Sequence, residues 1–169
     1  MEKTRSHLLD WLRDAHAMEQ QAEQMLKAQS SRLEHYPDLK ARIDQHLEET
    51  LGQQKLLEEA LARLDSSPST LKDIGGKLMA FGQAVGGMTA TDEVIKGAMA
   101  GYVFENMEIA SYTVLIAAAQ AAGDVETQRA CERILPQEVA MADWLREHLP
   151  SLTESFLARS EAPETPAKR

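Results

Sequence analysis

The sequence is poor in cysteine: Cys131 is the single one among 169 residues. One cysteine cannot form an intramolecular disulfide, and it cannot supply the several thiolates of a structural zinc cluster. Its surroundings, RACERIL, are typical of a helix interior, where a small buried thiol packs like an apolar side chain. Disulfide scaffolds and thiolate metal sites are therefore excluded as the basis of the fold.

Long apolar runs are missing as well. The longest stretch of low charge, IASYTVLIAAAQAAG, is shorter than the ~20 apolar residues that cross a bilayer. The amino-terminal stretch MEKTRSHLLDWLRDAHAME is charged in every turn and shows no apolar segment of a secretory signal peptide. We therefore expect a soluble, cytoplasmic protein with no membrane partner.

Positive charge is also scarce. The chain has 18 lysines and arginines against 27 aspartates and glutamates, which gives a formal net charge of −9. Nucleic acids and acidic membrane surfaces attract proteins with an excess of basic side chains. The charge balance therefore excludes nucleic acid as the expected partner.

Few aromatic residues (5%), 9 glycines and 6 prolines leave a composition dominated by good helix formers. Apolar residues recur with helical periodicity, and this pattern predicts four long helices at residues 4–34, 37–65, 91–122 and 124–148. Pro37 suits a first helical turn, and Gly123 suits the position just after a last turn. After Pro150 we expect a further short helix.

The spacing of these helices predicts their topology. The first two are joined by a tight link, and so are the last two, whereas the glycine-rich segment between them is long and favours one or two short helical pieces at residues 71–90. This order predicts an all-α fold, an antiparallel four-helix bundle with one long crossover, which is the ferritin-like arrangement. We expect residues 1–160 to form this domain and residues 161–169 to form a flexible polar tail.

Every predicted helix places a glutamate on its apolar stripe. Ionised side chains are rarely buried unless they are paired or bind metal. Five carboxylates at close range need cations to remain ionised, and hard oxygen ligands suit iron or manganese. The pattern therefore predicts a metal site, with room for two divalent ions, among five glutamates: Glu19, Glu49, Glu105, Glu108 and Glu138.

Two histidines stand near these glutamates at the same spacing. His46 precedes Glu49 by three residues, as His16 precedes Glu19. Each histidine has two open interpretations, as a metal ligand or as a hydrogen-bond partner that orients a carboxylate. A surface position is the competing interpretation, and it is stronger for His16, so the predicted site includes His46.

The segments DWLRDAHAMEQQAEQML, RIDQHLEETLGQ, GYVFENMEIASYTVL and MADWL occur in this order over nearly the whole chain. Together they resemble the YciE/YciF family of bacterial ferritin-like stress proteins, and its YciE branch in particular. The resemblance implies a cytoplasmic four-helix bundle that forms a homodimer, is related to rubrerythrins and manganese catalases, and carries a dinuclear metal site.

The same resemblance implies roles for the glutamates. Glu19, Glu49, Glu105 and Glu138 match the glutamates of the four helices, and Glu108 resembles the additional third-helix glutamate of rubrerythrins. The sequence departs from the family pattern because the usual Glu-x-x-His is absent from the second and fourth helices. Pro136 is a second departure, since it removes a helical hydrogen bond just before Glu138.

Two functions remain open at this point. The first is redox chemistry that depends on iron or manganese: oxidation of Fe(II) by oxygen or peroxide, or disproportionation of peroxide. The second is a non-enzymatic stress protein that keeps a vestigial metal site and acts through oligomerisation or protein interaction. The missing histidines favour the second function, the clustered glutamates favour the first, and the sequence does not decide whether the protein is an enzyme.

Overall fold

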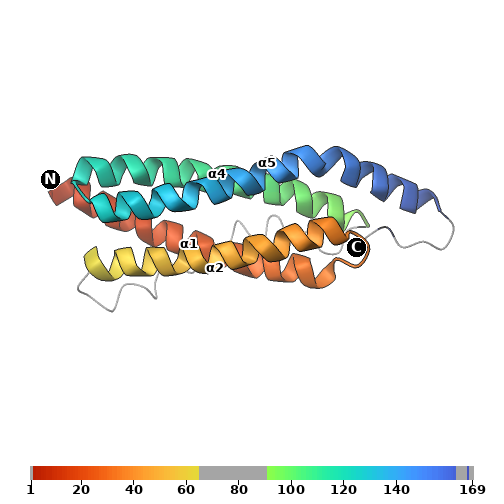
Figure 1. Ribbon diagram of the computed structural model, residues 1–169, viewed down its shortest axis with the longest axis horizontal. Helices are drawn as coiled ribbons and strands as arrows, with labels where there is room; N and C mark the ends of the chain where they lie inside the picture. Colours follow the sequence, from red (N-terminus) through yellow and green to blue (C-terminus); the bar gives the residue numbers. More distant parts are fainter. Residues whose placement is uncertain (1, 65–90, 163–166, 168–169) are drawn as a thin grey trace.

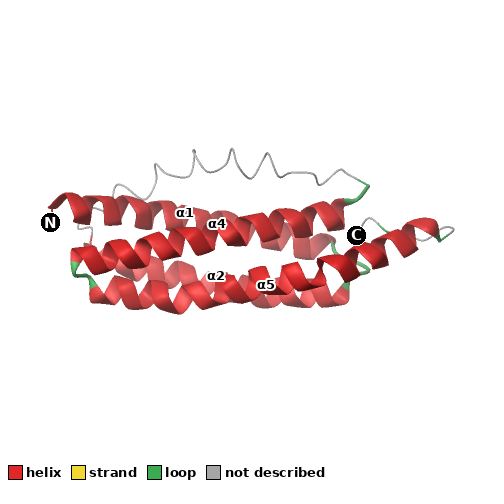
Figure 2. Cartoon of the chain, turned by 90° about the horizontal axis from the view of Figure 1, so that it is seen from above, coloured by secondary structure: helices red, strands yellow, loops and turns green. Residues whose placement is uncertain are grey.

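The computed structural model describes residues 2–64, 91–162 and 167. Within them the chain forms four helices: α1 (Glu2–Arg32), α2 (Pro37–Leu64), α4 (Glu93–Ala122) and α5 (Val125–Glu161). The described part contains helices and loops and no strand (Figure 2), which confirms the predicted all-α fold. The predicted helical pieces at residues 71–90 and most of the predicted tail lie outside the described residues.

The four helices lie side by side along the long axis of the molecule (Figure 1). α1 packs against α2 and α4, and α5 packs against α4 and α2. Tight links join α1 to α2 and α4 to α5, so each of these pairs is antiparallel. The predicted four-helix bundle is therefore confirmed. In the described part of the chain, no helix is apolar enough over a sufficient length to cross a membrane.

The turn between α4 and α5 depends on Gly123 and Asp124. Gly123 adopts a φ of 72°, in the left-handed region that favours glycine, and closes α4 where the sequence predicts its end. Asp124 then caps α5, because its side chain accepts two hydrogen bonds from Thr127, one from the backbone N–H (3.1 Å) and one from the Thr127 hydroxyl (2.6 Å). Arg63 of α2 donates to the same carboxylate at 2.9 Å and so joins three helices at this end.

The carboxyl-terminal part of the chain differs from the prediction. Instead of ending near His148 and restarting after Pro150, α5 continues to Glu161 with both Pro136 and Pro150 inside it. A proline deprives the carbonyl four residues earlier of its helical partner. Both prolines lie on the exposed side of α5, and so do the residues four positions before them, where water can bind the freed carbonyls. Leu152 is buried and anchors the extension.

The core includes two large apolar clusters, one toward each end of the bundle, and a small third cluster of Met18, Ala22 and Phe104. The first apolar cluster lies where α1 begins, and Cys131 is buried in it. The second lies where α1 ends and α2 begins. Its buried members are Leu26, Leu33, Tyr36, Leu39, Ile43, Val94, Ala98, Met141, Leu145 and Leu152. Along every helix the predicted glutamates fall between the positions that form these two clusters.

We predict that Asp124→Ala lowers the free energy of unfolding by about 1–2 kcal/mol, because it removes the α5 cap and one of the acceptors of Arg63. Urea denaturation checks this. Asp143→Ala is the matched control, since Asp143 makes only a solvent-exposed pair with Arg146 (3.0 Å), and we expect a change below about 0.5 kcal/mol. Equal effects of the two substitutions would contradict the role of Asp124.

Candidate metal centre

A layer of buried polar side chains separates the two apolar clusters at mid-length of the bundle. All four helices contribute to it, and its ionisable members are at most 3% exposed: Glu19 from α1, His46 from α2, Glu105 and Glu108 from α4, and Glu138 from α5. Glu105 and Glu108 share the inner face of α4 because residues three apart are neighbours on a helix. The sequence therefore folds into a bundle whose centre is charged.

Four of these residues meet at one point. His46, Glu105, Glu108 and Glu138 each offer one nitrogen or oxygen atom, and these four atoms lie within 4.8 Å of one another. One imidazole nitrogen and three carboxylate oxygens form a donor set that suits a divalent transition metal such as iron, manganese or zinc. Atoms this close can be brought onto one ion by small side-chain movements.

His46 is fixed from both sides of its ring. Nδ1 lies 2.7 Å from Glu49 Oε2, whereas Nε2 lies 3.2 Å from Glu105 Oε2 and 3.4 Å from Glu138 Oε2. When Nδ1 carries the proton and donates it to Glu49, the lone pair of Nε2 faces the two inner carboxylates. Hydrogen bonding of one ring nitrogen to a carboxylate is the usual way in which proteins orient a metal-binding histidine.

Without a metal, His46 acts as the cation of the layer. Burial lowers the pKa of His46, but the carboxylates of Glu105, Glu138 and Glu49 outweigh this effect and raise it to about 12. The pKa of Glu49 responds in the opposite direction: burial raises it, and the contact with His46 outweighs burial and lowers it. The imidazolium neutralises one carboxylate and leaves the others uncompensated.

Glu108 is the least compensated of these carboxylates. Both of its oxygens are buried and have no hydrogen-bond partner, and Glu138 Oε2 has none either. Burial, followed by the charges of Glu19, Glu138 and Glu105, raises the pKa of Glu108 well above its usual value. Burial also raises the pKa of Glu105, to about 7, against the opposing effect of His46. Buried oxygens without donors fit a cation, because a cation would replace the lost hydration.

Glu19 lies beside the four-residue group without belonging to it. Tyr112 of α4, which is fully buried, donates its hydroxyl hydrogen to Glu19 Oε1. The other oxygen of Glu19, Oε2, is buried without a partner. Burial and then the charge of Glu138 raise the pKa of Glu19 well above its usual value. Glu19 is thus held in place by one oxygen and offers the second to the layer.

Sequence reasoning missed Gln53 as a member of this layer. Gln53 is 1% exposed, and its Nε2 donates hydrogen bonds to Glu138 Oε1 and to Gln137 Oε1. The available signal was its position: it follows His46 by seven residues, which is two helical turns, on the stripe that continues to Leu57.

The structure brings together four of the six residues predicted from the sequence and places Glu19 next to them. Glu49 lies apart, toward the surface, because its side chain is 21% exposed and is not among the four whose donor atoms converge. The carboxylate of Glu49 contacts Nδ1 of His46 and accepts hydrogen bonds from Arg42 and Gln45. His16 also lies outside the group, and its Nε2 is 3.2 Å from Glu58 Oε1. Metal binding by the six residues stays a prediction.

Comparison with known protein families finds one that matches nearly the whole chain. Residues 3–158 match the family described as a domain of unknown function, DUF892. The matched segment contains all four helices up to the last turn of α5 and every residue of the buried polar layer.

Solved structures similar to this bundle include two bacterial proteins. A protein from Xanthomonas campestris pv. campestris is 44% identical, and the match covers 95% of this chain and 99% of that one with a TM-score of 0.80. The stress protein YciF of Escherichia coli is 22% identical, and the match covers 89% of this chain and 97% of that one with a TM-score of 0.76. The second likeness shows that the two proteins share a fold.

We predict that Glu108→Gln stabilises the metal-free protein at pH 7 by about 1–3 kcal/mol, because the amide is neutral without taking up a proton, whereas the buried Glu108 carboxyl group must be protonated on folding. The folded protein holds the Glu108 proton at a pH where the unfolded chain, with a pKa near 4.5, has lost it. Stability therefore falls as the pH rises above 4.5. Thermal melting in chelator should show this fall in the wild type and a smaller one in Glu108→Gln.

Proposed function

The chain belongs to the DUF892 family, and we propose that it is a ferritin-like stress-response protein that binds iron or manganese in the core of its bundle. One observation carries the proposal. Glu108 keeps two buried oxygens without hydrogen-bond donors at the point where His46, Glu105 and Glu138 also converge. Such an arrangement costs free energy in the metal-free protein, and a divalent cation offsets that cost.

The donors fall into two groups, one for each possible ion. His46 Nε2, Glu105, Glu108 and Glu138 would hold the first ion, and Glu19 Oε2 would contribute to a second ion if the site is dinuclear. A bound iron or manganese ion would supply redox chemistry, either oxidation of Fe(II) by oxygen or peroxide or disproportionation of peroxide.

The remaining residues of the layer prepare the site for that ion. Glu49 keeps the proton of His46 on Nδ1, so that the proton on Nε2 is the one released when a metal binds. Tyr112 fixes Glu19 through one oxygen and leaves the other free. The two apolar clusters close the layer on both sides along the bundle axis and limit the access of water.

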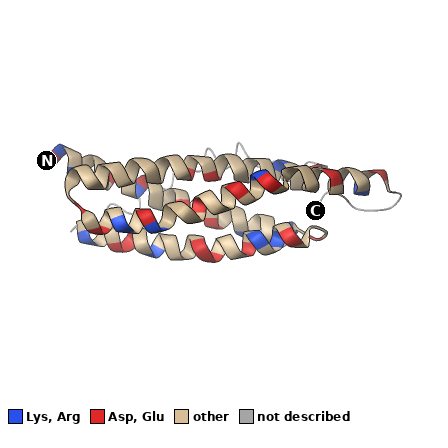
Figure 3. Cartoon of the chain, turned by 45° about the horizontal axis from the view of Figure 1, so that its top comes forward, with Lys and Arg blue, Asp and Glu red and all other residues tan. Residues whose placement is uncertain are grey.

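A second candidate function, protein interaction, has its own supporting observation on α4. Between Lys96 and the end of α4 the only charged residues are the buried Glu105 and Glu108, so most of this ribbon is tan in Figure 3. The outer side of α4 exposes Met99, Val103 and Val114 to solvent. A helix that is apolar on all sides is usually covered.

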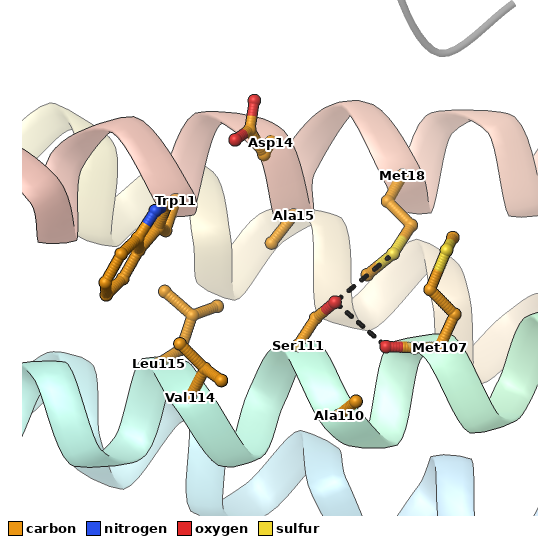
Figure 4. A pocket seen from close by; sticks show the side chains of 9 residues that line it. All are labelled: Trp11, Asp14, Ala15, Met18, Met107, Ala110, Ser111, Val114 and Leu115. Atoms are coloured by element: carbon orange, nitrogen blue, oxygen red, sulfur yellow. Dashed lines mark hydrogen bonds between the residues drawn. The ribbon is translucent and has the colours of Figure 1, made fainter.

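Next to this face, an apolar groove of about 470 Å³ lies between α1 and α4 (Figure 4). Trp11 of α1 and Val114 of α4 line one part of it, and Met18 and Met107 line another. We propose that a second copy of the chain covers this surface and forms a homodimer. Two chains with a charge of −9 repel each other, and an uncharged face is where they approach at the lowest cost.

We predict that the wild type, stripped of metal and titrated with Mn²⁺ or anaerobic Fe²⁺, gains about 2.7 kcal/mol of stability at a free concentration one hundred times Kd. His46→Ala should lose this gain. His16→Ala is the matched control, because it has the same spacing to a glutamate but contacts Glu58 outside the layer. Metal analysis and calorimetry measure both, and a wild type that binds neither ion would refute the metal site.

Activity separates the two candidate functions. We predict that the Fe²⁺-loaded protein oxidises its iron with oxygen or peroxide faster than free Fe²⁺ in the same buffer, or that the Mn²⁺-loaded protein consumes peroxide. Stopped-flow absorbance and an oxygen electrode measure these reactions, with His46→Ala as the inactive control. Metal binding without either reaction would leave the interaction function as the better candidate.

We predict that Val103→Glu combined with Val114→Glu converts the homodimer into monomers, because it places two carboxylates on the uncharged face of α4. Light scattering coupled to size-exclusion chromatography measures the mass. Leu157→Glu is the control, since Leu157 is an exposed apolar residue near the end of α5, in the part of this helix that extends beyond the other three (Figure 1). A monomeric wild type, or a dimer that survives the double substitution, would exclude this interface.

A further inference from the structure

We infer that Gln53 is a positioning residue of the metal centre: its side-chain amide holds Oε1 of Glu138 and leaves Oε2 to the cation. The inference rests on the proposed metal binding and concerns a residue outside the predicted ligand set. It explains why an uncharged polar side chain stands on the inner stripe of α2, between His46 and Leu57, where an apolar residue would pack equally well.

The contacts of Gln53 cross from α2 to α5. Its Nε2 donates one hydrogen bond to Glu138 Oε1 and a second, of 2.9 Å, to Gln137 Oε1. Both N–H bonds of the amide group are therefore used, and both partners are neighbours on α5. Gln53 is 1% exposed, so no water competes with these bonds at the surface. The amide group fixes the position of one carboxylate oxygen relative to α2.

The orientation of the amide group follows from its partners. The reversed orientation would point Gln53 Oε1 at the carboxylate oxygen of Glu138, which repels it, so the N–H side faces Glu138. As a result Gln53 Oε1 is buried without a partner. An unpaired buried amide oxygen costs about 1–3 kcal/mol. The protein keeps Gln53 despite this cost, which points to a role other than stabilising the fold.

The two oxygens of Glu138 therefore have different surroundings. Oε1 accepts from Gln53, whereas Oε2 has no hydrogen-bond donor and lies 3.4 Å from His46 Nε2. Glu138 therefore presents one oxygen to the point where the other donors converge. Gln53 achieves this without adding charge, and a glutamate at the same position would repel Glu138 in a layer that already holds four buried carboxylates.

The test replaces the amide group by a side chain of similar size that cannot donate a hydrogen bond. We expect Gln53→Met to bind Mn²⁺ 10–100-fold more weakly in calorimetry, the range found when groups that orient metal ligands are removed. Gln54→Met is the matched control, because Gln54 donates to the backbone oxygen of Glu19 (3.2 Å) and to Glu23 (2.8 Å) rather than to Glu138. The Mn²⁺ affinity of Gln54→Met should stay within about threefold of the wild-type affinity, which is a smaller change than the tenfold loss expected at the least for Gln53→Met.

Two further measurements separate positioning from a general effect on the fold. In a Glu138→Gln background, Gln53→Met should cause no further loss of Mn²⁺ affinity, since the carboxylate it positions is gone. In the Co²⁺-loaded protein, Gln53→Met should change the intensity of the visible absorption, because a released Glu138 can bind through both oxygens. An equal loss of affinity in both backgrounds would overturn the inference.

The outcomes distinguish this inference from the proposed function. If the wild type binds no Mn²⁺, both fail. If the wild type binds Mn²⁺ and Gln53→Met binds it equally well with an unchanged Co²⁺ spectrum, the inference alone fails and the metal site stands. Should Gln53→Met not fold, Gln53→Asn takes its place, because its shorter side chain keeps the polarity but does not reach Glu138, and the same results decide.

Discussion

The structure depends on the burial of a charged layer between two apolar clusters. Burial of a carboxylate costs several kcal/mol unless cations or donors compensate it, and this bundle buries four in one layer. Apolar burial in these two clusters offsets this cost, because the clusters pack all four helices together on both sides of the layer. His46, Tyr112 and Gln53 are each explained by the carboxylates that they neutralise or hold.

His46 connects the metal-free and metal-bound states of this layer. In the metal-free protein its raised pKa makes it an imidazolium that balances one carboxylate. In the proposed metal-bound protein it is a neutral ligand that keeps the Nδ1 proton on the side of Glu49. Glu105 and Glu108 also change protonation between the two states. Their raised pKa values favour the protonated carboxyl groups in the metal-free protein, and a divalent ion would displace these protons. The proposed metal binding would therefore exchange protons for metal charge within the layer.

The sequence predicts the parts of this structure that follow from periodicity. The four helices, the end of α4 at Gly123 and the inward position of Glu19 and Glu138 are confirmed, and so is the resemblance to the YciE/YciF family, although its YciE branch is not distinguished. The continuity of α5 was not predictable, because it depends on which side of the helix the two prolines face, and both lie on the exposed side. Gln53 was missed because an uncharged residue in the polar stretch RIDQHLEETLGQQ has no signal until α5 places Glu138 opposite it.

The two candidate functions share one helix and are therefore not independent. The inner side of α4 carries Glu105 and Glu108, and its outer side forms the uncharged face. Met107 and Ser111, which line the groove between α1 and α4, directly precede Glu108 and Tyr112 in the sequence. A chain that packs against this groove contacts side chains one residue away from the carboxylate layer. A partner on α4 would therefore rest on the helix that carries two of the proposed metal donors, Glu105 and Glu108.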